Sequence, residues 1–403
     1  MNDEARRVGA KIAAKRVELE LSQKEFGKRI KRSESWVSQV ERGVRKIDRM
    51  SVLEIVAEVL EIPISELQPA AIVEAATSGK PQAVSDLALA LTASSALRST
   101  LGRPFESDRD VGTADLLDGA KRAWELAHGS SYRELGEKLL DLLPQLEIAA
   151  RVATADEQTS LFAALAKAYH AAAAVLSKLG ETAAAWVAAD RAISRAERSG
   201  DPLLMAEGAF RLTIVFHSAR WLELARSTAE DADEALMALD MADNPSVHSL
   251  RGALNLQLAV LASRSDDADR AYAHLDVAAR LAEQLGEDRN DYDTEFGPTN
   301  VRLHEVSIAL GLGDAGRALR VGEALDASGL SAERQVRLLI DLARAHEQRR
   351  NVSGVMVALA AAEELAPEQV RSHPLVHKLL ADLSETSAAN DPAFIDLKER
   401  LVD

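Results

Sequence analysis

Apolar residues near the N-terminus recur at helical spacing and predict short helices. Val8, Ile12 and Leu19 lie on one face of a first helix. Phe26 and Ile30 supply the apolar face of a second helix. We therefore expect the chain to begin with a small helical unit packed around these side chains.

Capping signals mark where the second and third helices begin. Ser22 precedes the second helix and Glu25 follows three residues later, which is the spacing of a capping box. After a tight turn at 31–32, Ser33 is placed to cap a third helix over about 34–41. Two short helices joined by so brief a turn are typical of a helix-turn-helix.

The pattern continues to residue 67. Gly43 is expected to end the third helix, residues 50–60 form an apolar fourth helix, and 65–67 form a last helical turn. The sequence therefore predicts an N-terminal domain of five helical segments over residues 1–67.

This segment resembles the helix-turn-helix of the lambda repressor and XRE family over about residues 6–67. The resemblance is carried by Leu21-Ser22-Gln23, Trp36-Val37-Ser38 and Glu41-Arg42-Gly43. Lys31 stands where the family has a turn glycine, and the family's proline is missing from 44–50. Both departures affect loops and leave the surface that would face DNA unchanged.

The resemblance implies that the second and third helices contact double-stranded DNA. Side chains at the start of the second helix and on the exposed side of the third would face the major groove and adjacent phosphates; they are Gln23, Ser33, Glu34, Ser35, Ser38, Gln39 and Arg42. Cations that can neutralise phosphates are Lys24, Lys31, Arg32 and Arg45. Val37 is expected in the core, and Trp36 is expected to pack on the sugar-phosphate edge.

The balance of charged residues also changes at about residue 67. The formal net charge is −16, yet residues 1–67 hold 14 Lys and Arg against 12 Asp and Glu, leaving 34 against 52 in residues 68–403. A local basic patch on an acidic body is the distribution expected of a small DNA-binding domain fused to a larger module without DNA contacts.

The larger part of the chain repeats. Pro69 and 77–81 predict a linker, with one helix over 83–97 before a second break at 102–104. From residue 112 onward the pattern indicates paired helices, and small or apolar trios recur in the second helix of each pair. The trios are Leu135/Leu139/Leu142, Ala185/Ala189/Ala192, Ala225/Ala229/Ala232, Ala271/Leu275/Ala278, Ala318/Gly322/Leu325 and Val355/Leu359/Ala362.

Intervals of 37 to 50 residues between trio ends predict an α-solenoid over 112–403, closed by a hairpin from 373–385 and 392–401. Units such as 179–192 resemble tetratricopeptide repeats, and HEAT-like packing is the alternative. The run 288–301 resembles a stretch of actinobacterial XRE regulators that carry tetratricopeptide domains. The predicted fold class is all-α, a helix-turn-helix domain followed by a tetratricopeptide-like solenoid.

Composition and failed motifs argue against an enzyme. The chain has no cysteine, and aromatic residues make up 4%. The GxGxxG match at 311–316 has no strand before it, and His304 and His346 lack a second histidine four residues later. We expect no cofactor, no metal and no membrane contact, and a cytoplasmic protein.

A solenoid offers a concave surface for an extended peptide or partner helix. The resemblance extends to peptide-sensing regulators in which asparagines clamp a peptide backbone, and the corresponding candidates here are Arg211, Asn255, Asn300, Arg302 and His304. Three functions stay open: an effector-responsive homodimeric regulator of inverted-repeat DNA, a ligand-independent repressor whose solenoid dimerises or recruits a protein, and a phage-type or toxin–antitoxin regulator.

Overall fold

The computed structural model describes residues 3–45, 47, 50–62, 66–67, 80–92, 112–239 and 244–402. Within these ranges the chain is built of α-helices and turns, with an isolated bridge between Arg289 and Phe296 as extended pairing. The predicted all-α fold class is confirmed. Most of the predicted linker, including 77–79 and 102–104, lies outside the described residues.

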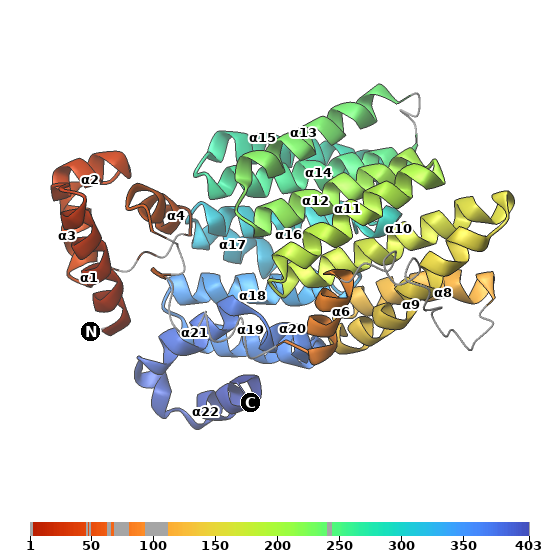
Figure 1. Ribbon diagram of the computed structural model, residues 1–403. Helices are drawn as coiled ribbons and strands as arrows, with labels where there is room; N and C mark the ends of the chain where they lie inside the picture. The colour runs from red at the N-terminus through yellow and green to blue at the C-terminus, as the bar shows by residue number, and fades with distance from the viewer. Residues whose placement is uncertain are drawn as a thin grey trace.

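The N-terminal helices are α1 (Asp3–Glu18), α2 (Gln23–Arg29), α3 (Glu34–Glu41) and α4 (Met50–Val59). Helices α2 and α3 begin directly after their predicted caps, Ser22 and Ser33, and α3 ends just before Gly43. Figure 1 shows these helices at the N-terminal end of the chain. Ser22 and Glu25 form the capping box, and the Trp36 amide donates to the Ser33 hydroxyl at 3.1 Å. Residues 63–65 fall outside the described part, so the fifth segment is described only at 66–67.

Lys31 has the left-handed backbone that the family assigns to glycine, with a φ of 54°, and Gly43 has a φ of 67° after α3. A lysine in this region carries a small strain that glycine avoids. The turn is nevertheless closed by a hydrogen bond from the Arg32 amide to the Gly27 carbonyl at 2.8 Å.

The rest of the described chain forms antiparallel helix pairs, stacked side by side. The helices are α6 (Gln82–Thr92), α8 (Thr113–His128), α9 (Tyr132–Val152), α10 (Ala155–Lys178), α11 (Thr182–Ser199), α12 (Pro202–Ser218), α13 (Leu222–Ala238), α14 (Pro245–Arg264), α15 (Ala268–Leu285), α16 (Pro298–Gly311), α17 (Ala315–Gly322), α18 (Ala332–Gln348), α19 (Val352–Leu365), α20 (Pro367–Arg371), α21 (Pro374–Ser384) and α22 (Pro392–Val402), with short 3-10 turns η2 (Asp291–Asp293) and η3 (Ser387–Asn390).

Small side chains on the second helix of each pair allow close packing against the first. Ala185, Ala189 and Ala192 on α11 are each fully buried, and the corresponding trios lie on α9, α13, α15, α17 and α19, with Leu325 just beyond α17. The tetratricopeptide-like solenoid is therefore confirmed. The helix expected within the linker is α6, whose Val84 and Leu87 pack in the same core as α8 to α11.

Helix α10 is long and apolar enough to cross a membrane, but 78% of its most apolar window is buried within the fold, as for a core helix of the stack. The GxGxxG match forms the turn between α16 and α17, where Gly313 has a φ of 85°.

The superhelix curls until its two ends meet. The Ser130 hydroxyl donates to the Gln369 side-chain oxygen at 2.7 Å, and the Arg133 amide donates to the Glu368 carboxylate at 2.9 Å. Helix α18 also contacts α8. These contacts join the two sides of the stack, and the first helices of the pairs line the space between them.

Candidate functional site

The N-terminal domain holds α2 and α3 on a common apolar core. Phe26, Ile30, Val37 and Val40 are buried there with Ile12 from α1. Val37 is the core residue that the sequence predicts, and the half-buried Trp36 packs against the edge of this core. The core fixes the angle between α2 and α3 and so the shape of the surface they present.

A partly buried ion pair ties the three helices together. The Arg16 guanidinium donates to both oxygens of Glu41, at 2.6 and 3.0 Å, and this hydrogen bonding raises the pKa of Arg16. The side-chain amide N–H of Gln23 donates a hydrogen bond to the Glu41 carboxylate at 2.7 Å. Gln23, predicted to meet DNA, thus also joins α2 to the end of α3 and leaves its side-chain oxygen for a further contact.

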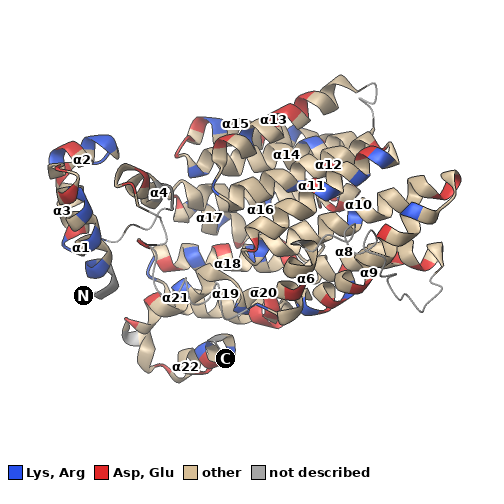
Figure 2. Ribbon diagram, in the orientation of Figure 1, with Lys and Arg blue, Asp and Glu red and all other residues tan. Residues whose placement is uncertain are grey.

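The other residues proposed to meet DNA lie on the surface of α2, α3 and the adjoining turns. Lys24, Lys31, Ser33, Glu34, Ser35, Arg42 and Arg45 are exposed, while Arg32, Ser38 and Gln39 are partly buried. Figure 2 marks several Lys and Arg positions in blue along α1 and α2, with acidic positions in red among them. The domain therefore presents a mainly cationic, polar face.

Arg32 also approaches the helical stack. Its guanidinium lies 6.0 Å from the Trp36 ring centre, and one nitrogen lies 4.0 Å from the Asp266 carboxylate in the turn before α15. Arg32 and an acidic residue of the repeat region are therefore within ion-pair distance.

A cavity of about 420 Å³ lies inside the curled superhelix. It is lined by residues of α8, α10, α12, α14, α16 and α18, together with α20 and α21 near the C-terminus. Among the lining residues, Lys and Arg outnumber Asp and Glu by six to four. A space of this size takes a small molecule, since ligand pockets measure about 300–1,000 Å³.

The segment 287–297 forms part of the cavity wall and is anchored by Phe296. Phe296 is fully buried against Gly252 of α14, and its backbone pairs with Arg289 at 2.8 and 2.9 Å. Tyr292 extends the anchor by donating to the Asp201 carboxylate at 3.0 Å. These contacts hold Asp293 and Glu295 at the cavity.

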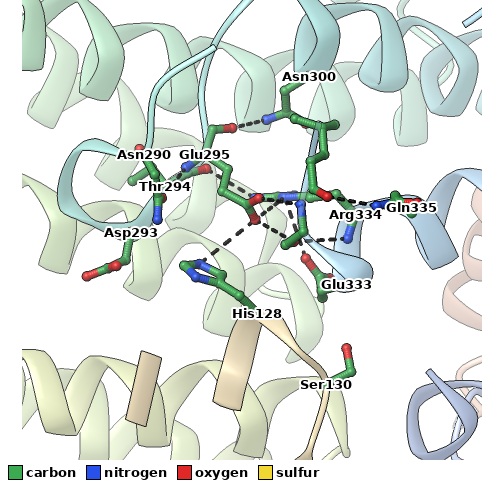
Figure 3. A network of polar contacts seen from close by, with 12 residues as sticks. His128, Ser130, Asn290, Asp293, Thr294, Glu295, Asn300, Glu333, Arg334 and Gln335 are labelled. Carbon is green, nitrogen blue, oxygen red and sulfur yellow. Dashed lines mark hydrogen bonds and ion pairs between the residues drawn. The ribbon is translucent and has the colours of Figure 1, made fainter. Parts of the chain in front are cut away.

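Glu295 connects distant repeats across the cavity wall. Its carboxylate accepts from the Ser331 amide at 3.0 Å and lies 3.4 Å from the Arg334 guanidinium and 3.8 Å from His128 (Figure 3). Arg334 also donates to the Thr294 carbonyl at 3.2 Å. The segment 287–297 thus links α8 to α18.

A second group of charged side chains, which includes Lys178 and Glu333, also lines the cavity. Lys178 lies 3.0 Å from Glu333. Burial alone would raise the pKa of Glu333, but Lys178 and the neighbouring arginines lower it, so the carboxylate stays ionised. Arg211 donates to the Asp293 carbonyl and lies 3.8 Å from Glu207.

Of the five effector candidates chosen from sequence, Arg211 lines the cavity. Each of the other four makes at least one polar contact within the fold, although the Asn300 side-chain oxygen and the His304 Nε2 have no hydrogen-bond partner among the described residues. Asn255 donates to Asp233 at 3.2 Å and lies 3.0 Å from His274. Asn300 donates to the Glu295 carbonyl, and the His304 ring lies 2.9 Å from the Asn300 carbonyl.

Arg302 is half exposed and pairs with Glu305 at 2.7 Å. Sequence reasoning missed Trp124, Arg334 and Arg337, which line the cavity from first helices of pairs. The available signal was a charged or polar residue at an otherwise apolar helical position.

Comparison with known protein families identifies the kind of domain that carries the cationic face of α2 and α3. The family described as "Helix-turn-helix domain" matches residues 7–70. Residues 7–70 are a helix-turn-helix domain, the kind that binds DNA. The helix-turn-helix domain is followed in this chain by the helical repeat region. No curated protein matches the chain.

Two solved structures show a distant likeness to the chain. BtubC (BKLC) from P. vanneervenii is 15% identical, with 64% of this chain and 91% of that chain covered and a TM-score of 0.37. PlcR from Bacillus thuringiensis, solved in complex with the peptide PapR7 and DNA, is 14% identical, with 89% and 99% covered and a TM-score of 0.33. Neither likeness is close enough to assign a ligand to this chain.

Proposed function

We propose that this protein is a sequence-specific transcriptional regulator whose helix-turn-helix domain binds operator DNA and whose helical-repeat domain dimerises and senses an effector. The observation that carries the proposal is the cationic face of α2 and α3 on a helix-turn-helix domain, within a chain of net charge −16. Cations clustered on one small domain of an acidic protein favour DNA as its partner.

Within this face, residue types suggest separate tasks. Gln39 can pair with adenine through both polar atoms of its amide, whereas Arg32, Arg42 and Arg45 neutralise phosphates. Replacing the three arginines by alanine is therefore expected to weaken binding to all DNA sequences. The salt slope should fall by about one for each phosphate that is no longer neutralised. Gln39→Ala should change base preference instead.

The matched control is Arg122→Ala, which removes an exposed arginine of α8 that pairs with Glu125 at 2.8 Å. Binding is measured by fluorescence anisotropy on selected genomic fragments over a range of salt concentrations. Equal losses of affinity in the Arg122 variant and in the triple variant would contradict the assignment of the DNA-binding face.

We also propose a homodimer, because one helix-turn-helix reads a single half-site and dimers of such domains bind half-sites about 34 Å apart. An exposed apolar patch supports a dimer surface on α11 and α13. Trp186 and Trp221 are each 46% exposed and their rings meet edge to face at 5.3 Å, with Leu224 also 46% exposed. Large exposed aromatic side chains that cluster in this way mark interaction surfaces.

The sensing role is assigned to the cavity rather than to an open groove. The contacts between 130–133 and 368–369 close the superhelix, and the space left inside suits a small effector or the end of a peptide. An effector that binds one curvature of the stack better than another shifts the balance between them. The approach of Asp266 to Arg32 supports a route from the stack to the DNA-binding face.

A further inference from the structure

We propose that the cavity is a binding site for a small anion that carries a carboxylate or phosphate group. This rests on the proposed function in one respect, that the anion would be the sensed effector. The site itself follows from polar groups that face the cavity without a protein partner.

The first observation is Arg337 on α18. It lines the cavity, and within the described chain it makes no hydrogen bond and no ion pair, although its neighbours Arg334 and Arg344 pair with Glu295 and Asp341. Its guanidinium carries five donors and cannot lose its charge under ordinary conditions. Burial, with a smaller effect of the nearby Arg334, lowers the pKa of Arg337, although Asp341 and Glu333 partly oppose this change.

The second observation is independent of Arg337. Trp124 of α8 is 4% exposed and Arg211 of α12 is 6% exposed, and both line the cavity. The Trp124 indole N–H has no hydrogen-bond partner in the described part of the protein, whereas the Arg211 Nε lies 3.8 Å from the Glu207 carboxylate. Buried donors without an acceptor cost free energy, and donors of this kind on α8 and α18, facing one space, fit a ligand that only accepts.

The charges around the cavity point to an anion rather than to a neutral acceptor. Three carboxylates on the wall already have a protein partner: Glu333 pairs with Lys178, Glu295 with Arg334, and Asp341 with Arg344 at 2.7 Å. Arg337 has no ion pair of its own among the described residues and only shares the field of Asp341 and Glu333. Burial and nearby arginines also lower the pKa of His217 on the same wall. A carboxylate or phosphate would supply both the missing acceptors and the missing negative charge.

The volume limits what the anion can be. A cavity of about 420 Å³ holds a molecule with one or two acidic groups and is too small for a long extended peptide. The ligand class is therefore a small metabolite with an acidic group.

The test uses the full chain with citrate or inorganic phosphate as probe, with ionic strength held constant by chloride. For wild type we expect a saturable rise of the thermal unfolding midpoint, because a ligand that binds only the folded state stabilises it. Arg337→Met should weaken the binding at least about tenfold, since a charged hydrogen-bonding group is removed. A response to phosphate alone assigns a phosphate ligand, and a response to citrate alone assigns a carboxylate.

Two further variants keep the test decisive. Trp124→Phe removes the indole donor but keeps an aromatic ring, and it should also weaken binding of the probe. This variant tests the site if Arg337→Met does not fold. Arg317→Met is the control, because Arg317 lies outside the cavity and pairs with Glu305 at 2.8 Å. An unchanged wild-type midpoint with both probes, or an equal rise in the Arg337, Trp124 and Arg317 variants, overturns the proposed anion site.

DNA affinity is measured on the same samples. Anion binding that depends on Arg337 but leaves DNA affinity unchanged supports the site and contradicts the sensing role. If the wild-type protein binds no DNA in any condition, the proposed regulatory function is wrong. The anion site is then judged by the thermal unfolding assay alone.

Discussion

The contact between Phe296 and Gly252 gives a quantitative prediction about the cavity wall. A Cβ built on Gly252 would lie 2.0 to 2.4 Å from three carbon atoms of the Phe296 ring, far inside van der Waals contact. Gly252→Ala is therefore expected to destabilise the protein by about 1–3 kcal/mol through overpacking. Phe296→Ala empties a fully buried ring position and is expected to cost about 3–5 kcal/mol.

The two changes should not add. Once the ring is removed, the new methyl group has nothing to clash with and partly fills the space, so the double variant should be no less stable than Phe296→Ala. The expected coupling is about 1–3 kcal/mol in the stabilising direction. Urea unfolding of the four proteins, followed by circular dichroism, measures this double-mutant cycle.

A matched control for the cycle is Gly329→Ala, where an added Cβ meets nothing within 4 Å. This variant should be close to wild type in stability. Additive losses of stability for Gly252 and Phe296, or a Gly252→Ala variant as stable as the Gly329 control, would show that the ring does not hold the segment 287–297 on α14. Other contacts would then have to hold this part of the cavity wall.

Three more outcomes follow from other contacts. Arg16→Ala removes the cation beside the partly buried Glu41 carboxylate, which keeps only the Gln23 hydrogen bond. The change should cost about 1–3 kcal/mol by urea unfolding, with weaker DNA binding; unchanged stability would contradict the role of this pair. Burial raises the pKa of Glu207 to about 8, so wild-type stability should fall as pH rises from about 4.5 towards 8, and a Glu207→Gln variant with the same pH profile would refute this. Trp186→Ala with Trp221→Ala should lower the mass in sedimentation from dimer to monomer, and a dimer that persists would place the interface elsewhere.

Local signals in the sequence determined the helix-turn-helix and the repeat architecture. Helix boundaries depend on contacts within one or two turns of the chain, so they can be recognised from the sequence alone. The examples are the capping box at Ser22 and Glu25, the cap at Ser33 and the helix end at Gly43. The same holds for the small-residue trios, because a buried helix face repeats along its own sequence. The left-handed backbone at Lys31 could also be predicted from the sequence, because related domains have a turn glycine at this position.

The cavity was decided only by the tertiary structure. Its residues come from helices as far apart as α8 and α21, and its shape depends on how much each pair rotates relative to the last. That rotation places Arg211 and Arg337 on one space and leaves Asn255 and Asn300 bonded inside the stack, although all four lie on first helices of their pairs. Sequence periodicity gives the face of a helix, whereas contact between distant repeats fixes which of those faces share a cavity.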